Sequence, residues 1–315
     1  MRKTILFKEW AEIWLKTVKG TVRGNTYAVT YKNTVYNHLI PCFGERELQT
    51  IKQTDIQLYL NDKAVFFCLD TLKKNKSCLK QMFEAAIDNE YLDKNPVRNI
   101  KMPRARTAEE KAIYTEEQIN YIFQYGNFHR FGYEIQLLID TGLSRSELLG
   151  LKWGDVDFDT KVLYIRRGVT DTPDPTTGKI TVTVDVPKNK FRERVIPLRQ
   201  EMCKILQSQK EQRKATTENY IVKTRNGQIC SPRTWSRRHY QIFMEDMRNY
   251  YSEKGIEIPI YTPHQFRHTR ASLWVNSDMS LYAIAKVMGH ADLDMLRKRY
   301  AHSDADQLRR LLNIK

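Results

Sequence analysis

Residues 261–275 read YTPHQFRHTRASLWV, a stretch that combines a helix start with closely spaced basic residues. Thr262, followed by a proline and then by Gln265, forms a capping box with proline in the first helical position, so a helix is expected to begin there. His264 and Arg267 then share one face of its first turns. Because a helix N-terminus presents free N–H groups and the positive end of the dipole, this face is suited to a phosphate. Alone, the HxxR spacing is a weak signal, and a solvated basic helix start is the alternative.

Residues 281–302, LYAIAKVMGHADLDMLRKRYAH, follow this helix. Their first part has apolar residues at helical spacing, and Gly289 stands where a glycine ends a helix. His290 therefore lies just past a helix end, where it is free to point into a cleft, and Tyr300 lies ten residues later in a basic segment. Taken singly, a capping histidine and a half-buried tyrosine are the ordinary interpretations.

A third stretch, TGLSRSELLGLKW at residues 141–153, places a polar cluster between a glycine and a leucine-rich run. Ser144 and Glu147 form an S-x-x-E capping box, which makes Arg145 the first helical residue. The cluster is therefore able to cap a helix, to bind an anion, or to do both.

The composition is that of a globular protein with an excess of positive charge. Hydrophobic residues make up 41% and aromatic residues 11% of the 315 residues, and this length suggests two domains with cores of their own. The net charge of +15 and an isoelectric point near 9.5 favour a polyanionic partner, of which nucleic acid is the commonest. A basic protein that is merely soluble is the alternative that composition leaves open.

Cysteine usage and hydropathy argue against a secreted, zinc-binding or membrane protein. The five cysteines are odd in number and far apart, and no CxxC or Cys/His cluster has zinc spacing. The start, MRKTILFKEWAEIW, has an apolar stretch too short and too interrupted for a signal peptide, and no run approaches the roughly 18 apolar residues of a membrane span. We expect a cytoplasmic protein with reduced thiols, no metal and no membrane contact.

Apolar spacing divides the chain into a helical first domain, a linker and a mixed second domain. At the start, FKEWAEIWL places Phe7, Trp10, Ile13 and Trp14 on one helical face. The later run KMPRARTAEEK carries proline and mixed charge without periodicity, as a linker does. The expected boundaries are 1–102 for the first domain, 103–112 for the linker and 113–315 for the second domain.

In the second domain, three runs rich in valine and isoleucine are separated by turn signals such as DTPDPTTGK. These runs are VLYIRRGV, KITVTVDVPK and RERVIPL. We expect them to pair as one small three-stranded antiparallel sheet. Helical patterns precede and follow them, so the expected fold is mainly α with a small antiparallel β-sheet.

Together these motifs resemble the tyrosine recombinase family, which comprises the phage-integrase and Xer-type site-specific recombinases. The resemblance rests on TPHQFRHT, on MGH with a later YAH, on ELLGLKWGDVDF, and on PKNKFRERVIPL, which looks like the family's lysine-bearing β-hairpin. FGERELQTIKQTDIQLYL and FEAAIDNEYLDKNPVRNI are similar to the family's helical core-binding domain. The resemblance covers nearly the whole chain. It implies a SAM-like helical core-binding domain followed by an α+β tyrosine recombinase catalytic domain, without the N-terminal arm-binding domain of longer members.

The resemblance also implies a mechanism. Tyr300 would attack a DNA phosphodiester, form a 3′-phosphotyrosyl bond and expel a 5′-hydroxyl, so that the bond energy is kept and no ATP is needed. His264, Arg267 and His290 would stabilise charge on the non-bridging oxygens or transfer a proton. Lys188 matches the family's lysine, the general acid toward the leaving oxygen. The family uses no metal or other cofactor.

One position departs from the family pattern. The family reads TGLRxSEL, with its first catalytic arginine directly after the leucine, whereas Ser144 stands at that place here and Arg145 follows it. Either Arg145 reaches in from the next position and supplies the guanidinium, or the site lacks one arginine. Losing one such contact costs on the order of a hundredfold or more in rate.

Basic clusters in both domains indicate contacts with duplex DNA, although a charge run is often only a solvated face. A protein that closes on DNA through many phosphate contacts has an affinity that depends steeply on salt. The residues that we expect at phosphates are Lys73, Lys74, Lys76, Lys190, Arg192, Arg194, Arg237 and Arg238.

The sequence therefore predicts a site-specific DNA recombinase that acts as a homo-tetramer on double-stranded DNA with specific recombination sites. The C-terminal DADQLRRLLNIK is a candidate for docking on a neighbouring subunit. A catalytically weakened relative that binds its sites as an accessory protein is the first alternative, because of Ser144. A type IB topoisomerase shares the chemistry and is the second alternative.

Overall fold

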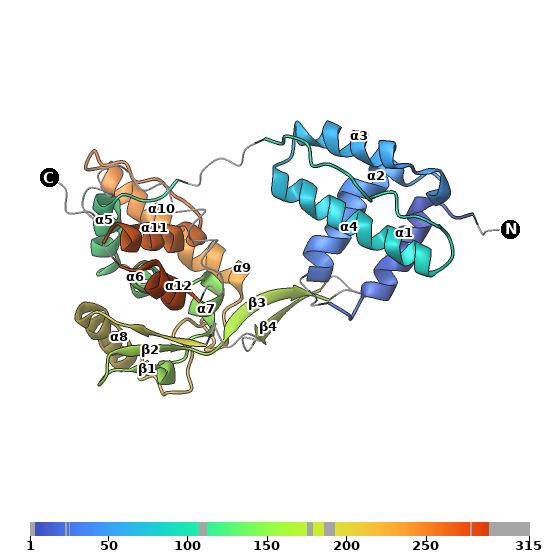
Figure 1. Cartoon of the computed structure of the whole chain (residues 1–315). Helices are drawn as coiled ribbons and strands as arrows, with labels where there is room; N and C mark the ends of the chain where they lie inside the picture. The colour runs from blue at the N-terminus through green and yellow to red at the C-terminus, as the bar shows by residue number, and fades with distance from the viewer. Residues whose placement is uncertain are drawn as a thin grey trace. The chain divides into compact units, whose positions relative to one another are not determined.

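The computed structural model describes residues 4–22, 24, 26–106, 112–174, 179–185, 193–277 and 279–289. The chain divides into two compact units (Figure 1). One comprises Met1–Glu110 with Thr172–Thr181, and the other comprises Lys111–Asp171 with Val182–Lys315. The division after residue 110 falls inside the linker expected at 103–112. Across the described ranges, no helix combines the length and the apolar character needed to cross a bilayer.

The first unit is a bundle of helices around an apolar core. Its elements are α1 (Phe7–Val18), the π-helical segments η1 (Thr26–Lys32) and η2 (Val35–Leu39), α2 (Ile40–Phe43), the 3₁₀ turn η3 (Leu48–Thr50), α3 (Gln53–Ala64) and α4 (Leu69–Asp88). Phe7, Trp10 and Trp14 are buried, and the Trp10 indole N–H donates to the Met82 carbonyl of α4 at 2.9 Å. Ile13, expected on the same face, is 40% exposed, because at roughly 100° per residue it falls outside the buried stripe.

In the second unit, α5, α7, α8 and α11 contact α6, whose residues are all buried. Figure 1 shows the helices of this unit. They are α5 (Glu116–Gly126), α6 (Gly132–Thr141), α7 (Arg145–Gly150), α8 (Gln200–Gln212), α9 (Pro232–Trp235), α10 (Gln241–Ser252), α11 (Pro263–Asn276) and α12 (Leu281–Met288), with the 3₁₀ turn η4 (Trp153–Asp155) and the π-helical η6 (Ser236–Tyr240). The buried acids of α6 have partners: Glu134 accepts the Trp235 indole N–H at 2.6 Å, and Asp140 pairs with Arg199. Pairing of this kind is required of buried charges.

The strands form two separate sheets. Strands β1 (Val156–Asp157), β2 (Val162–Ile165) and β5 (Arg194–Pro197) are antiparallel in the order β1-β2-β5, while β3 (Gly168–Pro173) pairs only with β4 (Ile180–Asp185) among the strands described. The expectation of one sheet built from three runs is therefore wrong. After Ile165, Arg166 and Arg167 turn aside to pair with Asp155, and the chain then leaves the first sheet. Gly168 permits this segment to approach α7 closely, since a Cβ there would lie 2.9 Å from the Ser146 hydroxyl oxygen.

Candidate active site

Helix α11 begins where the sequence predicts. Thr262 is its extended N-cap, proline follows, and the Thr262 N–H donates to the Gln265 side-chain oxygen at 2.8 Å. This cap sets the register of the two candidate residues that follow. His264 is exposed in the first turn, with its ring 4.5 Å from that of His268. Arg267 lies one turn later and points inward.

Arg267 binds backbone carbonyls at the ends of two helices, α6 and α12. Its side chain is 9% exposed, and its guanidinium donates to the Gly142 carbonyl at 2.9 Å and to the Met288 carbonyl. Gly142 and Gly289 both adopt the left-handed conformation, at φ of 64° and 67°, and end α6 and α12 respectively. A cation at a helix C-terminus is favoured by the dipole and binds carbonyls that have no partner within the helix. The packing of the helix ends therefore fixes the position of this guanidinium.

The capping box at Ser144 is also confirmed. The Ser144 N–H donates to the Glu147 carboxylate at 2.8 Å, and the Glu147 N–H donates to the Ser144 hydroxyl at 3.3 Å. Arg145 is the first residue of α7, and its side chain is exposed. Its guanidinium donates to the Ser236 hydroxyl at 2.8 Å, at the first residue of η6. Arg145 thus points toward the segment that carries the two exposed arginines Arg237 and Arg238.

Glu147 is the hub of a buried ion-pair cluster. Its carboxylate lies 2.7 Å from an Arg194 nitrogen and 3.5 Å from an Arg267 nitrogen. Burial raises the pKa of Glu147, but the hydrogen bonds and charge of Arg194, the charge of Arg267 and the Ser144 amide together lower it to about 2. The carboxylate is therefore charged at neutral pH, and it holds two guanidinium groups side by side.

Arg194 is the residue of this cluster for which the sequence predicted a different role. We expected it among the phosphate contacts, whereas its side chain is only 4% exposed and its Nε donates to the Val287 carbonyl at the end of α12. The period of two along β5 is a signal for this placement, since Arg194 and Ile196 are buried while Val195 is exposed. The identity of its partner is not readable from the sequence, because Glu147 lies far away along the chain.

The remaining predicted residues divide into three groups. Lys73 and Lys74 on α4 and Arg237 and Arg238 on η6 are exposed, as phosphate contacts should be. Lys76 instead donates to the Ile100 carbonyl at 2.6 Å. Outside the described residues lie Lys188, Lys190, Arg192, His290 and Tyr300.

Gly289, the residue before His290, is described, and it ends the helix whose last carbonyls receive Arg194 and Arg267. Within the described ranges, no three histidine, cysteine, aspartate or glutamate side chains gather as metal ligands would. The Glu147 cluster thus lies at the end of α12, where the described chain stops just before the predicted site residue His290.

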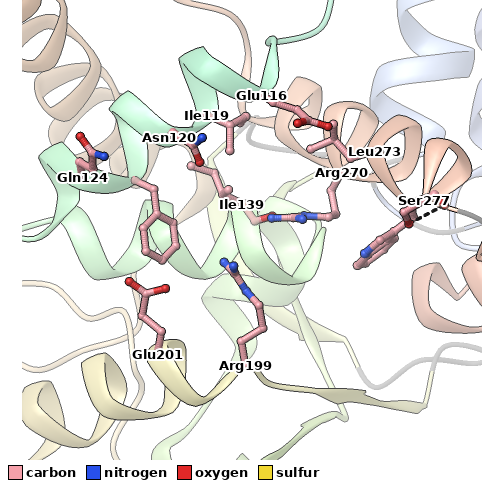
Figure 2. Close-up of a pocket in the computed structure, with 12 residues that line it drawn as sticks. Glu116, Ile119, Asn120, Gln124, Ile139, Arg199, Glu201, Arg270, Leu273 and Ser277 are labelled. Atoms are coloured by element: carbon pink, nitrogen blue, oxygen red, sulfur yellow. Dashed lines mark hydrogen bonds between the residues drawn. The ribbon is translucent and has the colours of Figure 1, made fainter.

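A cavity of about 440 Å³ lies elsewhere in the same unit, between α5, α6, α11 and the start of α8 (Figure 2). Arg270 and Arg199 extend into it from opposite sides, and Arg270 donates to the Ile139 carbonyl at 2.5 Å. None of the residues predicted for catalysis is among its described lining residues. Burial and the nearby Arg199 lower the pKa of Arg270, although Asp140 opposes this. The cavity is thus a feature separate from the Glu147 cluster.

Two family models match the chain. The model described as the phage integrase family matches residues 112–307, and that of the phage integrase N-terminal SAM-like domain matches residues 6–64. A XerC-like tyrosine recombinase of Caldanaerobacter subterraneus subsp. tengcongensis is 26% identical over 289 residues, which are 88% of this chain and 73% of that protein. The transposase of transposon Tn916 from Enterococcus faecalis is 26% identical over 275 residues, 84% of this chain and 66% of that protein.

Solved structures have the same fold. A Tn1549 transposon integrase in complex with transposon right end DNA matches with a TM-score of 0.76 at 22% identity, covering 96% of this chain and 98% of that one. A lambda integrase dimer bound to a core site matches with a TM-score of 0.63 at 18% identity, over 92% of this chain and 97% of that one. This chain is thus mainly helical with small antiparallel sheets, and it combines a SAM-like N-terminal domain with an integrase catalytic domain.

Proposed function

The chain belongs to the phage integrase family, the site-specific tyrosine recombinases, and we propose that it cuts and rejoins DNA through a covalent bond between Tyr300 and a 3′-phosphate. The observation that carries the proposal is the family match over residues 112–307, which includes every residue proposed for catalysis. The Glu147 cluster supports it, because it holds Arg267 at the end of α12, which is the last described element before His290 in the sequence.

In the proposed reaction, the Tyr300 oxygen attacks phosphorus, and the bond to the 5′-oxygen of the next nucleotide breaks. The phosphodiester is exchanged for a phosphotyrosyl ester of similar energy, so the second transfer can rejoin a different strand. Arg267, His264 and His290 stabilise the charge that develops on the non-bridging oxygens or transfer the proton that the Tyr300 hydroxyl gives up, and Lys188 protonates the leaving 5′-oxygen. Arg145 supplies a further guanidinium from the edge of the site.

Ser144 favours a second candidate, a DNA-binding relative with weakened catalysis. Ser144 caps α7 where the family has its first arginine, and the Arg145 guanidinium is bound to Ser236. In this alternative, the protein holds its recombination sites as an accessory factor while another enzyme supplies the strand transfer. The alternative requires specific binding without covalent attachment.

A nicked suicide duplex that carries the recombination half-sites separates these functions. The recombinase forms a covalent adduct that resists denaturation, that forms in the presence of a chelator, and that is absent from Tyr300→Phe. Specific binding without an adduct would support the accessory function, and relaxation of any plasmid would support a topoisomerase. The same assay on Ser144→Arg and Arg145→Ala decides which residue supplies the guanidinium. If Arg145→Ala cleaves as fast as wild type, Arg145 has no part in the reaction.

We also infer that the substrate is double-stranded DNA and that four copies act together on two duplexes. The exposure of Lys73, Lys74, Arg237 and Arg238 supports contacts with phosphates. Lys190 and Arg192 lie outside the described residues, and we propose them as phosphate contacts from the sequence alone. A lambda integrase tetramer bound to a Holliday junction, with a TM-score of 0.62 to this chain, supports the assembly. Lys76 is better assigned to the structure of the first unit, because its ammonium binds the Ile100 carbonyl.

A further inference from the structure

We propose that Arg194 is a positioning residue for strand cleavage, which acts through Glu147 to hold Arg267 and the end of α12 in place. The proposal rests on the proposed function, since it assigns Arg267 and His290 to the reaction. It replaces the role of phosphate contact that the sequence suggested for Arg194.

The contact between Arg194 and Glu147 is the first step of the argument. Two nitrogens of Arg194 bond to the two oxygens of Glu147, at 2.7 Å and 3.2 Å. A bidentate pair of this kind fixes orientation as well as distance, and a lysine cannot reproduce it. Because both side chains are mostly buried, water does not replace either partner. The plane of the Glu147 carboxylate is thus set by Arg194.

The second step is the link from Glu147 to Arg267. The Glu147 oxygen that accepts the 3.2 Å bond from Arg194 also lies 3.5 Å from Arg267 Nη1. Within the described part of the chain, these two arginines are the cations paired with Glu147. Without Arg194, the Glu147 carboxylate would keep Arg267 as its one counter-ion among the described residues. The Arg267 guanidinium would then be drawn toward Glu147 and away from Gly142 and Met288. A displacement of about 1 Å in a catalytic group can cost on the order of a hundredfold in rate.

The third step is the end of α12. Arg194 donates to the Val287 carbonyl and Arg267 donates to the next carbonyl, that of Met288. A Cβ at Gly289 would lie only 3.1 Å from an Arg194 nitrogen, so this guanidinium packs directly against the residue that precedes His290. Arg194 therefore contacts both the last turn of α12, at Val287 and Gly289, and Glu147, the carboxylate beside Arg267.

The chain offers a matched control in Asp155. This buried carboxylate is also held by two arginines, since Arg167 lies 2.6 Å and Arg166 lies 3.1 Å from its oxygens. Arg167→Met leaves Asp155 with one arginine, just as Arg194→Met leaves Glu147 with one. Methionine keeps most of the apolar stem in both variants. Comparing these two variants therefore separates the effect of losing a buried ion pair from the effect of losing the position of Arg267.

The test compares cleavage of the nicked suicide duplex by wild type, Arg194→Met, Arg194→Lys and Arg167→Met, at saturating DNA. We expect Arg194→Met to lower the cleavage rate by about a hundredfold. Its affinity for the duplex should stay within about threefold of wild type. Arg167→Met should cleave at close to the wild-type rate, and Arg194→Lys should recover part of the loss because it keeps the charge. Circular dichroism and melting temperature establish that each variant is folded.

A double variant adds a second test, which compares the loss of cleavage rate in the double variant with the losses in the two single variants. If Arg194 acts through Glu147, Arg194→Met combined with Glu147→Gln should cleave no more slowly than the slower single variant, because both changes break one linkage. Additive losses would overturn the proposal. So would an affinity that falls in step with cleavage, which marks a phosphate contact, or equal losses in Arg194→Met and Arg167→Met. An absence of adduct from wild type would instead contradict the proposed function itself.

Discussion

Glu147, whose side chain is mostly buried, and Asp155, which is fully buried, have the same local arrangement in the second unit. Each stands at the third position of a helical turn and accepts the backbone N–H of the residue before the turn, from Ser144 in one case and from Lys152 in the other, both at 2.8 Å. Each carboxylate is then held by two arginines. Capping and charge pairing together explain why an acid is tolerated at both buried positions.

The two clusters differ in where their arginines come from and in how deeply these are buried. Arg166 and Arg167 are consecutive, they follow β2 directly, and they are 50% and 21% exposed. The arginines of Glu147 come from β5 and α11 and are almost fully buried. The Asp155 cluster therefore closes a local turn, whereas the Glu147 cluster joins four elements, namely α7, β5, α11 and α12. The same chemistry stabilises a local turn at Asp155 and connects elements distant in sequence at Glu147.

Replacing each acid by its amide should give the largest changes in stability and cleavage. It is also the most direct test of whether the two clusters differ in function. Glu147→Gln removes the anion that Arg194 and Arg267 share in the described part of the chain, so we expect a loss of about 3–5 kcal/mol of stability. Cleavage by the folded fraction should fall by about a hundredfold or more, because Arg267 loses its alignment. Asp155→Asn should also destabilise the protein, but its folded fraction should cleave within about threefold of wild type.

Urea unfolding and single-turnover cleavage measure the two quantities separately. If Asp155→Asn loses as much cleavage as Glu147→Gln does, the Glu147 cluster has no special relation to the reaction. The comparison would then reduce to two structural ion pairs in one catalytic unit.

The pattern of caps was predictable from sequence, and the Glu147 cluster was not. Local signals predicted the starts of α7 and α11 at Ser144 and Thr262 and the end of α12 at Gly289, because caps depend on residues a few positions apart. The pairing of Arg194 with Glu147 depends on packing between segments distant in sequence. For the same reason, the runs of valine and isoleucine predicted strands but not which strands pair.

Acid should weaken the Glu147 cluster within a defined pH range. The pKa of Glu147 falls from 4.5 to about 2 on folding, which corresponds to on the order of 3 kcal/mol. Since the folded-state value is the lower one, this contribution is complete above about pH 4.5 and is lost as the pH falls toward 2. The unfolding free energies of wild type and Glu147→Gln should therefore converge between these pH values. A difference between them that stays constant down to pH 3 would contradict the charged pairing with Arg194 and Arg267.

The smallest change in stability and cleavage is expected at Gly289, the residue at the end of α12 that packs against Arg194. Gly289 and Gly255 both have positive φ, of 67° and 75°, so an alanine at either position costs about 1–2 kcal/mol. They differ in surroundings: a Cβ at Gly255 has no neighbour within 4 Å among the described residues, whereas at Gly289 it would press on the Arg194 guanidinium.

Gly289→Ala should therefore lose slightly more unfolding free energy than Gly255→Ala does in urea titrations, and it alone should slow cleavage. An arginine side chain has the freedom to move by a few tenths of an ångström, so the additional loss of stability should stay below about 1 kcal/mol. The effect on cleavage should be disproportionate to it, because the displaced group is the one that aligns Glu147. Equal cleavage by the two variants would mean that the end of α12 tolerates a shift of Arg194, and that Glu147 alone suffices to hold Arg267.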